Sequence, residues 1–232
     1  MKKKKILIIL QARSSSKRFP KKVLKKIKGI PLVVLCYKRL TNKNSKAIVA
    51  TSNKKSDDKL VNILKKNQIP YFRGSLNNVL SRYQKIAQQM PLKNLIIRAT
   101  SDNPFPDGNL VEIICSHFIK SKKDYMQIES ELHGLPKGIR LEIFTVKKLL
   151  SLKKNLSIKD KEHVTYKIYK NRKHFYKYIF DNLKLKNNLS KVSVSIDSLY
   201  EYKYVKKIFE KFNNPITVSF RKLLKNVFTK NY

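Results

Sequence analysis

The sequence contains two groups of residues whose types suit a phosphorylated ligand. The stretch "QARSSSKRFPKK", residues 11–22, holds five cations, three consecutive serines and one proline. Asp102 and Asp197 are acidic residues in a chain that has only 15 Asp+Glu. Two carboxylates on one rim can hold Mg²⁺ through their oxygens while phosphate groups complete the coordination shell. Together the loop and the carboxylates predict a nucleoside-triphosphate site without a Walker A or a G-x-G-x-x-G sequence.

Each of these features follows a predicted β-strand. The run "ILIIL" at 6–10 is entirely apolar, as in a strand that is buried on both faces of a parallel sheet. Further strands are predicted at 46–51, 69–74, 94–100 and 191–197. Ligands of open parallel sheets bind beyond the carboxyl ends of the strands. We therefore expect the basic loop, Asp102 and Asp197 to lie on one rim.

Amphipathic helices alternate with these strands in the first half of the chain. They are predicted at 30–40, 57–66, 76–87 and 107–120. This order predicts an α/β fold, a Rossmann-like, doubly wound, mostly parallel sheet with helices on both faces. From about residue 124 the pattern is less regular and indicates a small irregular β extension. There "DYMQIES", "GIRLEIF" and "HFYKYIFDNL" resemble strands, and 158–169 and 200–212 resemble helices. We interpret residues 1–232 as a single domain.

Each acidic residue, taken alone, also has a simple structural explanation. Aspartate is a common helix cap or turn former, and Asp102 precedes Asn103-Pro104, a typical turn sequence. A lone histidine such as His163 can bind a substrate or only brace a helix against a sheet. The combination of both aspartates with the basic loop is what favours a functional site.

The net charge of +38 comes from 53 Lys+Arg that are spread along the whole chain. A nucleic-acid site should be localised, and the sequence has no RNA-binding motif, so we expect no specific nucleic-acid partner. Frequent Lys, Asn and Ile, whose codons are A/T-rich, make compositional drift the preferred explanation. Cys36 and Cys115 form no metal or disulfide pattern, and no segment is long enough to cross a bilayer. The sequence predicts a cytoplasmic protein without membrane insertion.

The order of several short motifs resembles the SpsF-type cytidylyltransferase-like family. That family is related to the enzymes that activate 3-deoxy-manno-octulosonate and sialic acids, in the nucleotide-diphospho-sugar transferase superfamily. The entry motif reads "IILQARSSSKRFPKKVL" here. It is followed by "IVATSNKKSDD", "YFRGSLNNVLSRY", "IIRATSDNPFPD", "GIRLEIF", "DKEHVTYKIY" and "VSIDSLYEY". The resemblance covers roughly residues 5–210 and depends on the shared order of many motifs.

The resemblance implies a Mg²⁺-dependent enzyme that transfers CMP from CTP to a sugar and releases pyrophosphate. About residues 1–123 would form the nucleotide-binding half and about 124–232 the sugar-side half. The implied triphosphate ligands are Arg13, Ser16, Arg18 and Lys22, of which Arg18 and Lys22 would act in catalysis together with Asp102. Ala50, Thr51, Arg73 and Gly74 would lie near the cytosine, and Asp102 and Asp197 would hold the metal. Arg140, Glu142, Glu162 and His163 match positions on the sugar side.

Three departures from the family pattern bear on catalysis. The family has glycine where this chain has Ser15 and Lys21, and glycine allows positive φ and close approach of the backbone to phosphate. The family's G-x-D-x-E reads Gly-Ile-Arg-Leu-Glu here, so that Arg140 replaces a carboxylate. Arg140 could capture an acidic group of the substrate, or it could mark altered or lost catalysis.

The sequence is therefore compatible with three functions. The first is a cytidylyltransferase that makes a CMP-activated, acidic sugar for surface polysaccharide. The second is a nucleotide- or sugar-binding relative without transfer chemistry, and the third, ranked last, is a basic RNA-associated protein. Related sugar cytidylyltransferases are often dimers, so a homodimer is an expectation from the resemblance alone. The sequence does not name the sugar.

Overall fold

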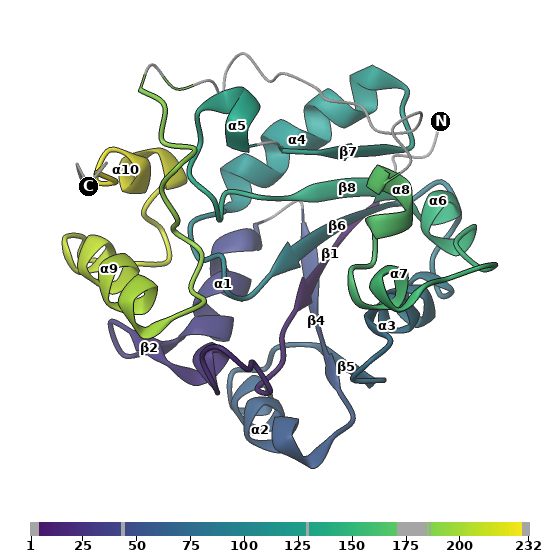
Figure 1. Ribbon diagram of the computed structural model, residues 1–232, viewed down its shortest axis with the longest axis horizontal. Coiled ribbons are helices and arrows are strands. Elements are labelled where there is room, and N and C mark those ends of the chain that lie inside the picture. The colour runs from purple at the N-terminus through teal and green to yellow at the C-terminus, as the bar shows by residue number, and fades with distance from the viewer. Residues whose placement is uncertain (1–4, 43–44, 129, 171–184, 186, 229–232) are drawn as a thin grey trace.

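The computed structural model describes residues 5–42, 45–128, 130–170, 185 and 187–228. Its centre is a six-stranded sheet in the order β5-β4-β1-β6-β8-β7 (Figure 1). The strands are β1 Ile6–Gln11, β4 Lys46–Ser52, β5 Tyr71–Gly74, β6 Leu95–Thr100, β7 Tyr125–Gln127 and β8 Glu142–Thr145. β5, β4, β1 and β6 are parallel neighbours, whereas β8 is antiparallel to both β6 and β7. The predicted mostly parallel sheet is confirmed.

The register of the central strands brings their carboxyl ends level. Gln11 at the end of β1 pairs with Ala50 of β4 and with Thr100 of β6. Every loop that leaves these strands therefore starts from the same edge of the sheet. This edge is where ligands of open α/β sheets bind.

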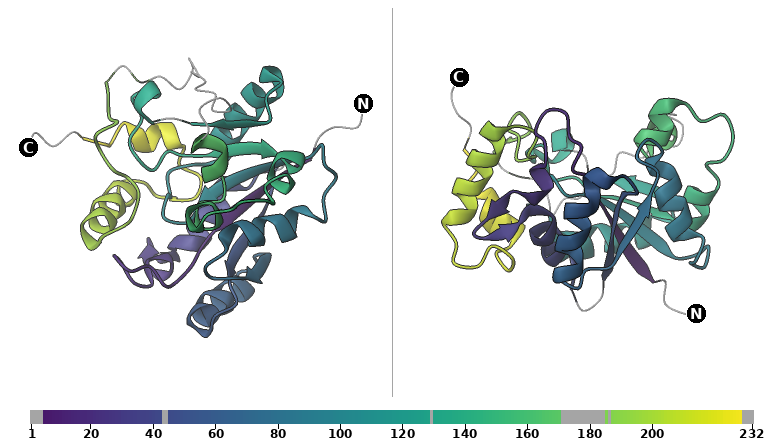
Figure 2. Two further views of the ribbon diagram at one scale, coloured as in Figure 1. Left: turned by 45° about the vertical axis from the view of Figure 1, so that its right-hand side comes forward. Right: turned by 90° about the horizontal axis from the view of Figure 1, so that it is seen from below.

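Helices cover both faces of the sheet, as the apolar pattern predicts (Figure 2). Alternation along β1 sends Ile8 and Leu10 into one core and Ile9 into the other. The first core also contains residues of α1 Leu32–Leu40, α2 Asp58–Lys66, α4 Gly108–Ser121, α9 Leu199–Glu210 and α10 Phe220–Leu224. The second contains residues of α3 Val79–Ala87, α6 Val146–Leu150 and α8 Tyr166–Lys170. The apolar run at 6–10 in β1 is thus explained by burial on two sides.

The second half of the chain differs from the prediction in two described places. The helix expected at 158–169 is two helices, α7 Ile158–Glu162 and α8, because Val164 takes a φ of 31° between them. The segment 191–197 is not a strand of the sheet. Its backbone groups bond to loops instead, with one isolated bridge between Ser193 and Lys137. The predicted strand "HFYKYIFDNL" lies outside the described residues.

Several short elements were not predicted. They are η1 Lys22–Leu24, β2 Lys26–Ile27, β3 Ile30–Pro31, η2 Lys55–Asp57, α5 Ser130–His133, α6 and α10. Of these elements, η1 bears on the site, because it begins at Lys22 and sets the backbone conformation there. Among the described residues, no helix is both long and apolar enough to span a membrane.

A buried aspartate ties the C-terminal segment to the sheet. Asp107 is 6% exposed and accepts the backbone N–H of Leu110 at 3.0 Å, which caps α4. Its second oxygen accepts the N–H of Phe220 at 2.7 Å. Arg39, also buried, donates to carbonyl groups on both sides of the same junction, those of Phe105 and Val218. These bonds hold the start of α10 and the segment before it against the core.

Candidate nucleotide site at the carboxyl ends of the strands

A cleft of about 850 Å³ opens beyond the carboxyl ends of β1 and β6. Its walls come from the basic loop, from the residues after β6 and from α7, with Asp197 on one side. The sequence-predicted residues that line it are Arg13, Ser16, Arg18, Lys22, Asp102, Glu162, His163 and Asp197. Residues from both halves of the chain therefore share one cavity, at the rim where the strand pattern placed it.

Lys22 lies between the two aspartates. Its Nζ donates to Asp102 Oδ2 at 2.7 Å and to Asp197 Oδ1 at 2.7 Å. Arg18 adds a second cation, with Nη2 at 3.0 Å from the other oxygen of Asp197. The Lys22 residue is 7% exposed, so its ammonium group is held by these carboxylates with little access to water.

The backbone brings the two aspartates together independently of Lys22. The N–H of Ile196 donates to the carbonyl of Asp102 at 2.8 Å, which joins the C-terminal segment to the turn after β6. The N–H of Asp197 donates to Glu201 Oε2 at 2.7 Å, and Ser198 caps α9 through the N–H of the same glutamate. Although 191–197 is not a strand, Asp197 is therefore fixed on the predicted rim.

These carboxylates fit a divalent cation. Asp102 Oδ2 and Asp197 Oδ1 both contact one nitrogen atom, so two hard oxygen ligands already face a single point. No group of three or more His, Cys, Asp or Glu side chains that could hold a metal ion occurs among the described residues. The protein would supply two ligands, and the rest of the shell would have to come from phosphate oxygens and water.

The basic loop is a compact turn that closes on itself. Lys21 has a φ of 56°, a left-handed conformation that favours glycine, and its N–H donates to the carbonyl of Ser14 at 3.0 Å. Lys21 thus adopts a conformation that glycine takes without strain. Ser15, the other departure, is not among the described residues with positive φ, so serine fits there without strain.

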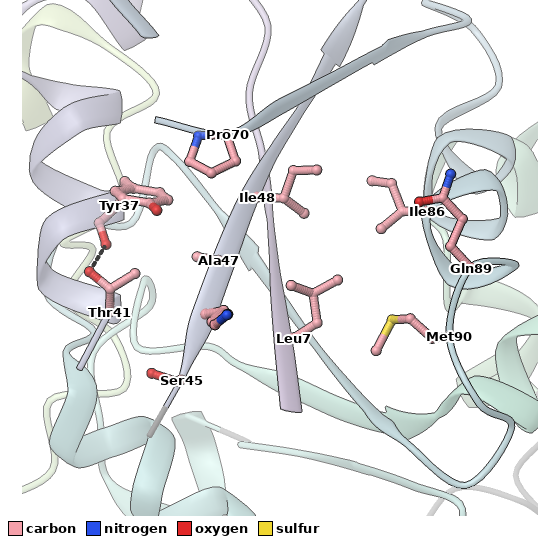
Figure 3. Close-up of a pocket in the computed structure, with 11 residues that line it drawn as sticks. Leu7, Tyr37, Thr41, Ser45, Ala47, Ile48, Pro70, Ile86, Gln89 and Met90 are labelled. Carbon is pink, nitrogen blue, oxygen red and sulfur yellow. Dashed lines mark hydrogen bonds between the residues drawn. The ribbon is translucent and has the colours of Figure 1, made fainter. Parts of the chain in front are cut away.

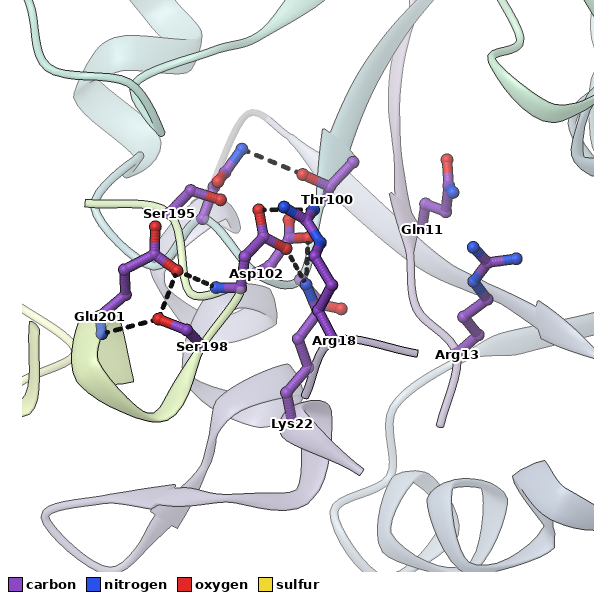
Figure 4. Close-up of polar contacts among 12 residues, drawn as sticks. Gln11, Arg13, Arg18, Lys22, Thr100, Asp102, Ser195, Ser198 and Glu201 are labelled. Atoms are coloured by element: carbon purple, nitrogen blue, oxygen red, sulfur yellow. Dashed lines mark hydrogen bonds and ion pairs between the residues drawn. The ribbon is translucent and has the colours of Figure 1, made fainter. Parts of the chain in front are cut away.

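Arg13 stands apart from the cluster around Lys22 (Figure 4). Its Nη2 lies 3.5 Å from Glu162 of α7, on the far wall of the cleft. His163 lies next to this pair and packs its ring 6.3 Å from the ring of Tyr166. The contact between Arg13 and Glu162 connects the basic loop to α7.

The four residues expected near the cytosine do not line the cleft. Arg73 turns away from it and donates to Asp58 at 2.7 Å and to the carbonyl of Ser52 at 3.0 Å. Ala50 and Thr51 end β4, and their polar groups bond within the protein: the Ala50 carbonyl accepts the N–H of Ala12, and Thr51 donates to Asp57. Gly74 closes β5, where its backbone carbonyl accepts the N–H of Asn53 at 2.8 Å.

Arg140 is exposed and contacts the buried Glu142 beside the cleft. Glu142 is 1% exposed and contacts Arg98 at 2.6 Å and Arg140 at 3.3 Å. Burial alone raises the pKa of Glu142, but the two guanidinium groups and the hydroxyl of Thr165 lower it overall. Arg140 also reaches Gln127 at 2.9 Å. The arginine in the family's acidic position is thus an ion-pair partner of the neighbouring glutamate.

Sequence reasoning missed several lining residues. They are Gln11, Ala12, Val23, Leu76, Asn77, Arg98, Thr100, Ser101 and Ile158. Arg98 and Thr100 alternate on β6, and this period-2 spacing directly before Asp102 was a usable signal. Ile158 is 81% exposed at the start of α7, a position that periodicity does not distinguish from an ordinary surface residue.

A second hollow of about 500 Å³ lies at the opposite edge of the sheet, near the starts of β1 and β4 (Figure 3). Most of its wall is apolar, from residues such as Leu7, Ile48 and Met90. It has no carboxylate in its lining and lacks the converging charges of the cleft. The chemistry described above therefore belongs to the cleft at the carboxyl edge.

Residues 7–208 match the family described as cytidylyltransferase. The chain belongs to the cytidylyltransferase family. Among curated relatives of this cytidylyltransferase, the spore coat polysaccharide biosynthesis protein SpsF of Bacillus subtilis is 29% identical over 227 residues, which cover 94% of this chain and 92% of SpsF. A Methanocaldococcus jannaschii protein, MJ1063, is 34% identical over 170 residues, 72% of this chain and 68% of that protein.

Solved structures show the same fold as this cytidylyltransferase. A cytidylyltransferase from Leptospira borgpetersenii superposes with a TM-score of 0.85 at 24% identity, over 97% of this chain and 94% of that one. The CMP:2-keto-3-deoxy-manno-octonic acid synthetase complexed with CTP superposes with a TM-score of 0.62 at 12% identity, over 89% of this chain and 99% of that one. The predicted family and fold class are both confirmed.

Proposed function

We propose that this cytidylyltransferase transfers CMP from CTP to an acidic sugar, releases pyrophosphate and requires Mg²⁺. The observation that carries the proposal is the convergence of Lys22, Asp102 and Asp197 at the mouth of the basic loop. SpsF is a spore coat polysaccharide biosynthesis protein, and the synthetase of similar fold is complexed with CTP. The name of SpsF supports a role in making a surface polysaccharide, and the bound CTP of the synthetase supports CTP as the nucleotide. The proposal places the reaction in the cytoplasm.

In this proposal the cationic residues of the cleft bind the triphosphate and its carboxylates bind the metal. Arg18 and Lys22 would leave the carboxylates and contact the triphosphate, with Arg13 and Ser16 on the same loop. Asp102 and Asp197 would then hold Mg²⁺, which offsets the negative charge that grows on the pyrophosphate leaving group. Cationic side chains at the loop stabilise the same charge in the transition state. A sugar hydroxyl would attack the α-phosphorus from the side of α7.

The sugar-side residues favour an anionic acceptor. Arg98 and Arg140 together carry two positive charges against the single charge of Glu142, so the cluster has a net positive charge of one. Arg98 reaches the cleft wall, and Glu162 with His163 closes the other side. A carboxylate on the sugar would be attracted to this cluster.

The test is product analysis after incubation with CTP, Mg²⁺ and a panel of acidic and neutral sugars. The proposal expects pyrophosphate release and a product whose mass is that of a CMP-sugar, with an acidic sugar as the best acceptor. Asp102→Ala should lose both signals. Tight CTP binding without any turnover would instead favour the non-catalytic relative, a reading that the replacement of the family's carboxylate by Arg140 keeps open.

A further inference from the structure

We propose that Asp57, together with Arg82, positions the basic loop for triphosphate binding, although neither side chain lines the cleft. This inference rests on the proposed function, since the loop is taken to hold the phosphates. Asp57 is 0% exposed and lies in η2, directly before α2. It was not among the residues that the sequence motifs singled out.

The carboxylate of Asp57 joins two segments that are far apart in sequence. Its Oδ1 accepts the backbone N–H of Ser14, in the basic loop, at 2.6 Å across a separation of 43 positions. Its Oδ2 accepts the hydroxyl of Thr51 at 3.1 Å and the N–H of Ser52 at 3.2 Å, at the end of β4. The Ser52 hydroxyl donates to the same oxygen. One side chain therefore fixes the loop against the edge of the sheet.

Only an ionised carboxylate satisfies this set of partners. All four groups around Asp57 donate, and a carboxylate accepts at both oxygens, whereas an amide would point its own N–H at other donors. Burial alone raises the pKa of Asp57, but the hydrogen bonds from Ser52 and Ser14 lower it overall. The side chain thus carries a buried negative charge directly beneath a loop that is proposed to bind an anion.

Arg82 supports the loop indirectly, through the end of β4. It is 0% exposed, and its Nη1 donates to the carbonyl of Ala50 at 3.2 Å. The same carbonyl accepts the N–H of Ala12, the first residue of the basic loop after β1. Burial lowers the pKa of Arg82, while the negative charge of Asp57 acts in the opposite direction. Asp57 and Arg82 therefore secure the loop at Ser14 and at Ala12.

The support from Asp57 and Arg82 does not involve the cationic side chains of the basic loop. Among the described residues, neither Asp57 nor Arg82 forms an ion pair with another side chain. The support of the loop consequently uses none of Arg13, Arg18 and Lys22, all of which line the cleft. A loop that is ordered before the nucleotide arrives binds it more tightly, because less conformational entropy is lost on binding.

The test compares Asp57→Asn with Asp107→Asn. Asp107 is the matched control, since it is also a buried aspartate that accepts two backbone N–H groups, one from its own helix and one from Phe220, 113 positions away, and it too lies outside the cleft lining. Hydrogen exchange of the peptide that spans 12–18, measured without nucleotide, reports loop order. Calorimetric titration with CTP and Mg²⁺ reports affinity, and thermal unfolding confirms that each variant is folded.

We expect Asp57→Asn to accelerate exchange of the loop peptide and to weaken CTP binding by about ten-fold or more. Asp107→Asn should lower the melting temperature without either effect. Unchanged loop exchange in folded Asp57→Asn, or an equal loss of CTP affinity in Asp107→Asn, would overturn the proposal. If Asp57→Asn does not fold, Ser52→Ala is the second variant, because it removes one donor to Asp57. It should accelerate loop exchange and weaken CTP binding by smaller amounts. A Ser52→Ala protein with the loop exchange and CTP affinity of the parent would also overturn the proposal. A parent protein that binds no CTP would refute the proposed function, while the exchange measurement would still decide the role of Asp57.

Discussion

The backbone N–H of Ile196 donates to the carbonyl of Asp102 at 2.8 Å, and this single bond places Asp197 beside Asp102. The two carboxylates are brought together by main-chain geometry, and the Lys22 ammonium then lies between them at 2.7 Å from each. The lysine therefore occupies the point that suits a divalent cation. The proposed Mg²⁺ would compete with the lysine for the same oxygens.

Lys22→Met should strengthen metal binding in the absence of nucleotide. Removal of the ammonium leaves two adjacent carboxylates without their shared cation, so Mn²⁺ affinity, followed by electron paramagnetic resonance, should rise about ten-fold or more. The same variant should lose CTP-dependent turnover. Lys17→Met is the control, since Lys17 lines the cleft but forms no ion pair with Asp102 or Asp197. Equal Mn²⁺ affinity in both variants would contradict competition between lysine and metal.

Asp102→Asn and Asp197→Asn should each abolish most of the protection that CTP and Mg²⁺ give against heat. A ligand at 100 times its Kd stabilises a protein by about 2.7 kcal/mol, or about 5–10 °C in a chain of this size. Replacement of either carboxylate removes half of the proposed protein ligands to the metal. The measurement is thermal unfolding with and without nucleotide and metal. Full protection in either variant would show that its carboxylate is not needed.

Lys21→Gly should stabilise the protein. Lys21 is exposed and has a φ of 56°, where glycine has no steric penalty. We expect a gain of about 0.5–1 kcal/mol in the free energy of unfolding, measured by urea denaturation. Lys17→Gly, at a position without positive φ, should instead be neutral or slightly destabilising. A loss of stability in Lys21→Gly would mean that the lysine side chain contributes more than its backbone strain costs.

The stability of the protein should fall in acid in a way that depends on Glu142. Because its pKa is lower in the folded than in the unfolded state, its contribution is complete above the ordinary value of 4.5 and is lost as the pH falls through the folded value. Glu142→Gln removes this dependence and leaves buried Arg98 without its carboxylate partner, at a cost of about 3–5 kcal/mol. Thermal unfolding between about pH 7 and pH 3 measures both effects. Glu210→Gln, at an exposed ion pair, should change neither.

Gly74→Ala should destabilise the protein by about 1–3 kcal/mol through a clash with Arg82. A Cβ at Gly74 would lie 2.7 Å from Arg82 Cγ and 3.1 Å from the ring of Phe72. Gly108→Ala is the comparison, because its Cβ would meet only the side chain of Asn42, at 3.1 Å, and alanine favours the start of α4. Chemical denaturation measures the free energy of unfolding of both variants. Equal stabilities would show that Arg82 can move aside at little cost.

The strand pattern predicts correctly the edge of the sheet where the site lies, but it is wrong about the secondary structure of the segment 191–197. The apolar run of β1 and the alternation of helices and strands fix a parallel sheet, because only burial on both faces explains "ILIIL". The pattern predicts a strand at 191–197 and therefore places Asp197 on the rim. The segment forms no strand of the sheet, but the hydrogen bond from the N–H of Ile196 to the carbonyl of Asp102 still brings Asp197 to that rim.

Side-chain partners were beyond the reach of the sequence. Asp57 lies within the quoted motif "IVATSNKKSDD", yet nothing in that motif distinguishes it from its neighbour Asp58, which is exposed and pairs with Arg73. Likewise, Arg140 is an arginine in an acidic family position, and only the structure shows that Arg98 and Arg140 share Glu142.

The sequence by itself determined the α/β sheet, the edge at which the ligand site lies and the family to which the chain belongs. These follow from local periodicity and from the order of motifs, both of which are properties of neighbouring residues. The tertiary structure alone decided that Lys22 joins two aspartates, up to 175 positions away, and that Asp57 supports the basic loop. The physical reason is that hydrogen bonds and ion pairs depend on distances of a few ångströms between side chains, and sequence spacing does not set those distances once the chain has crossed the sheet.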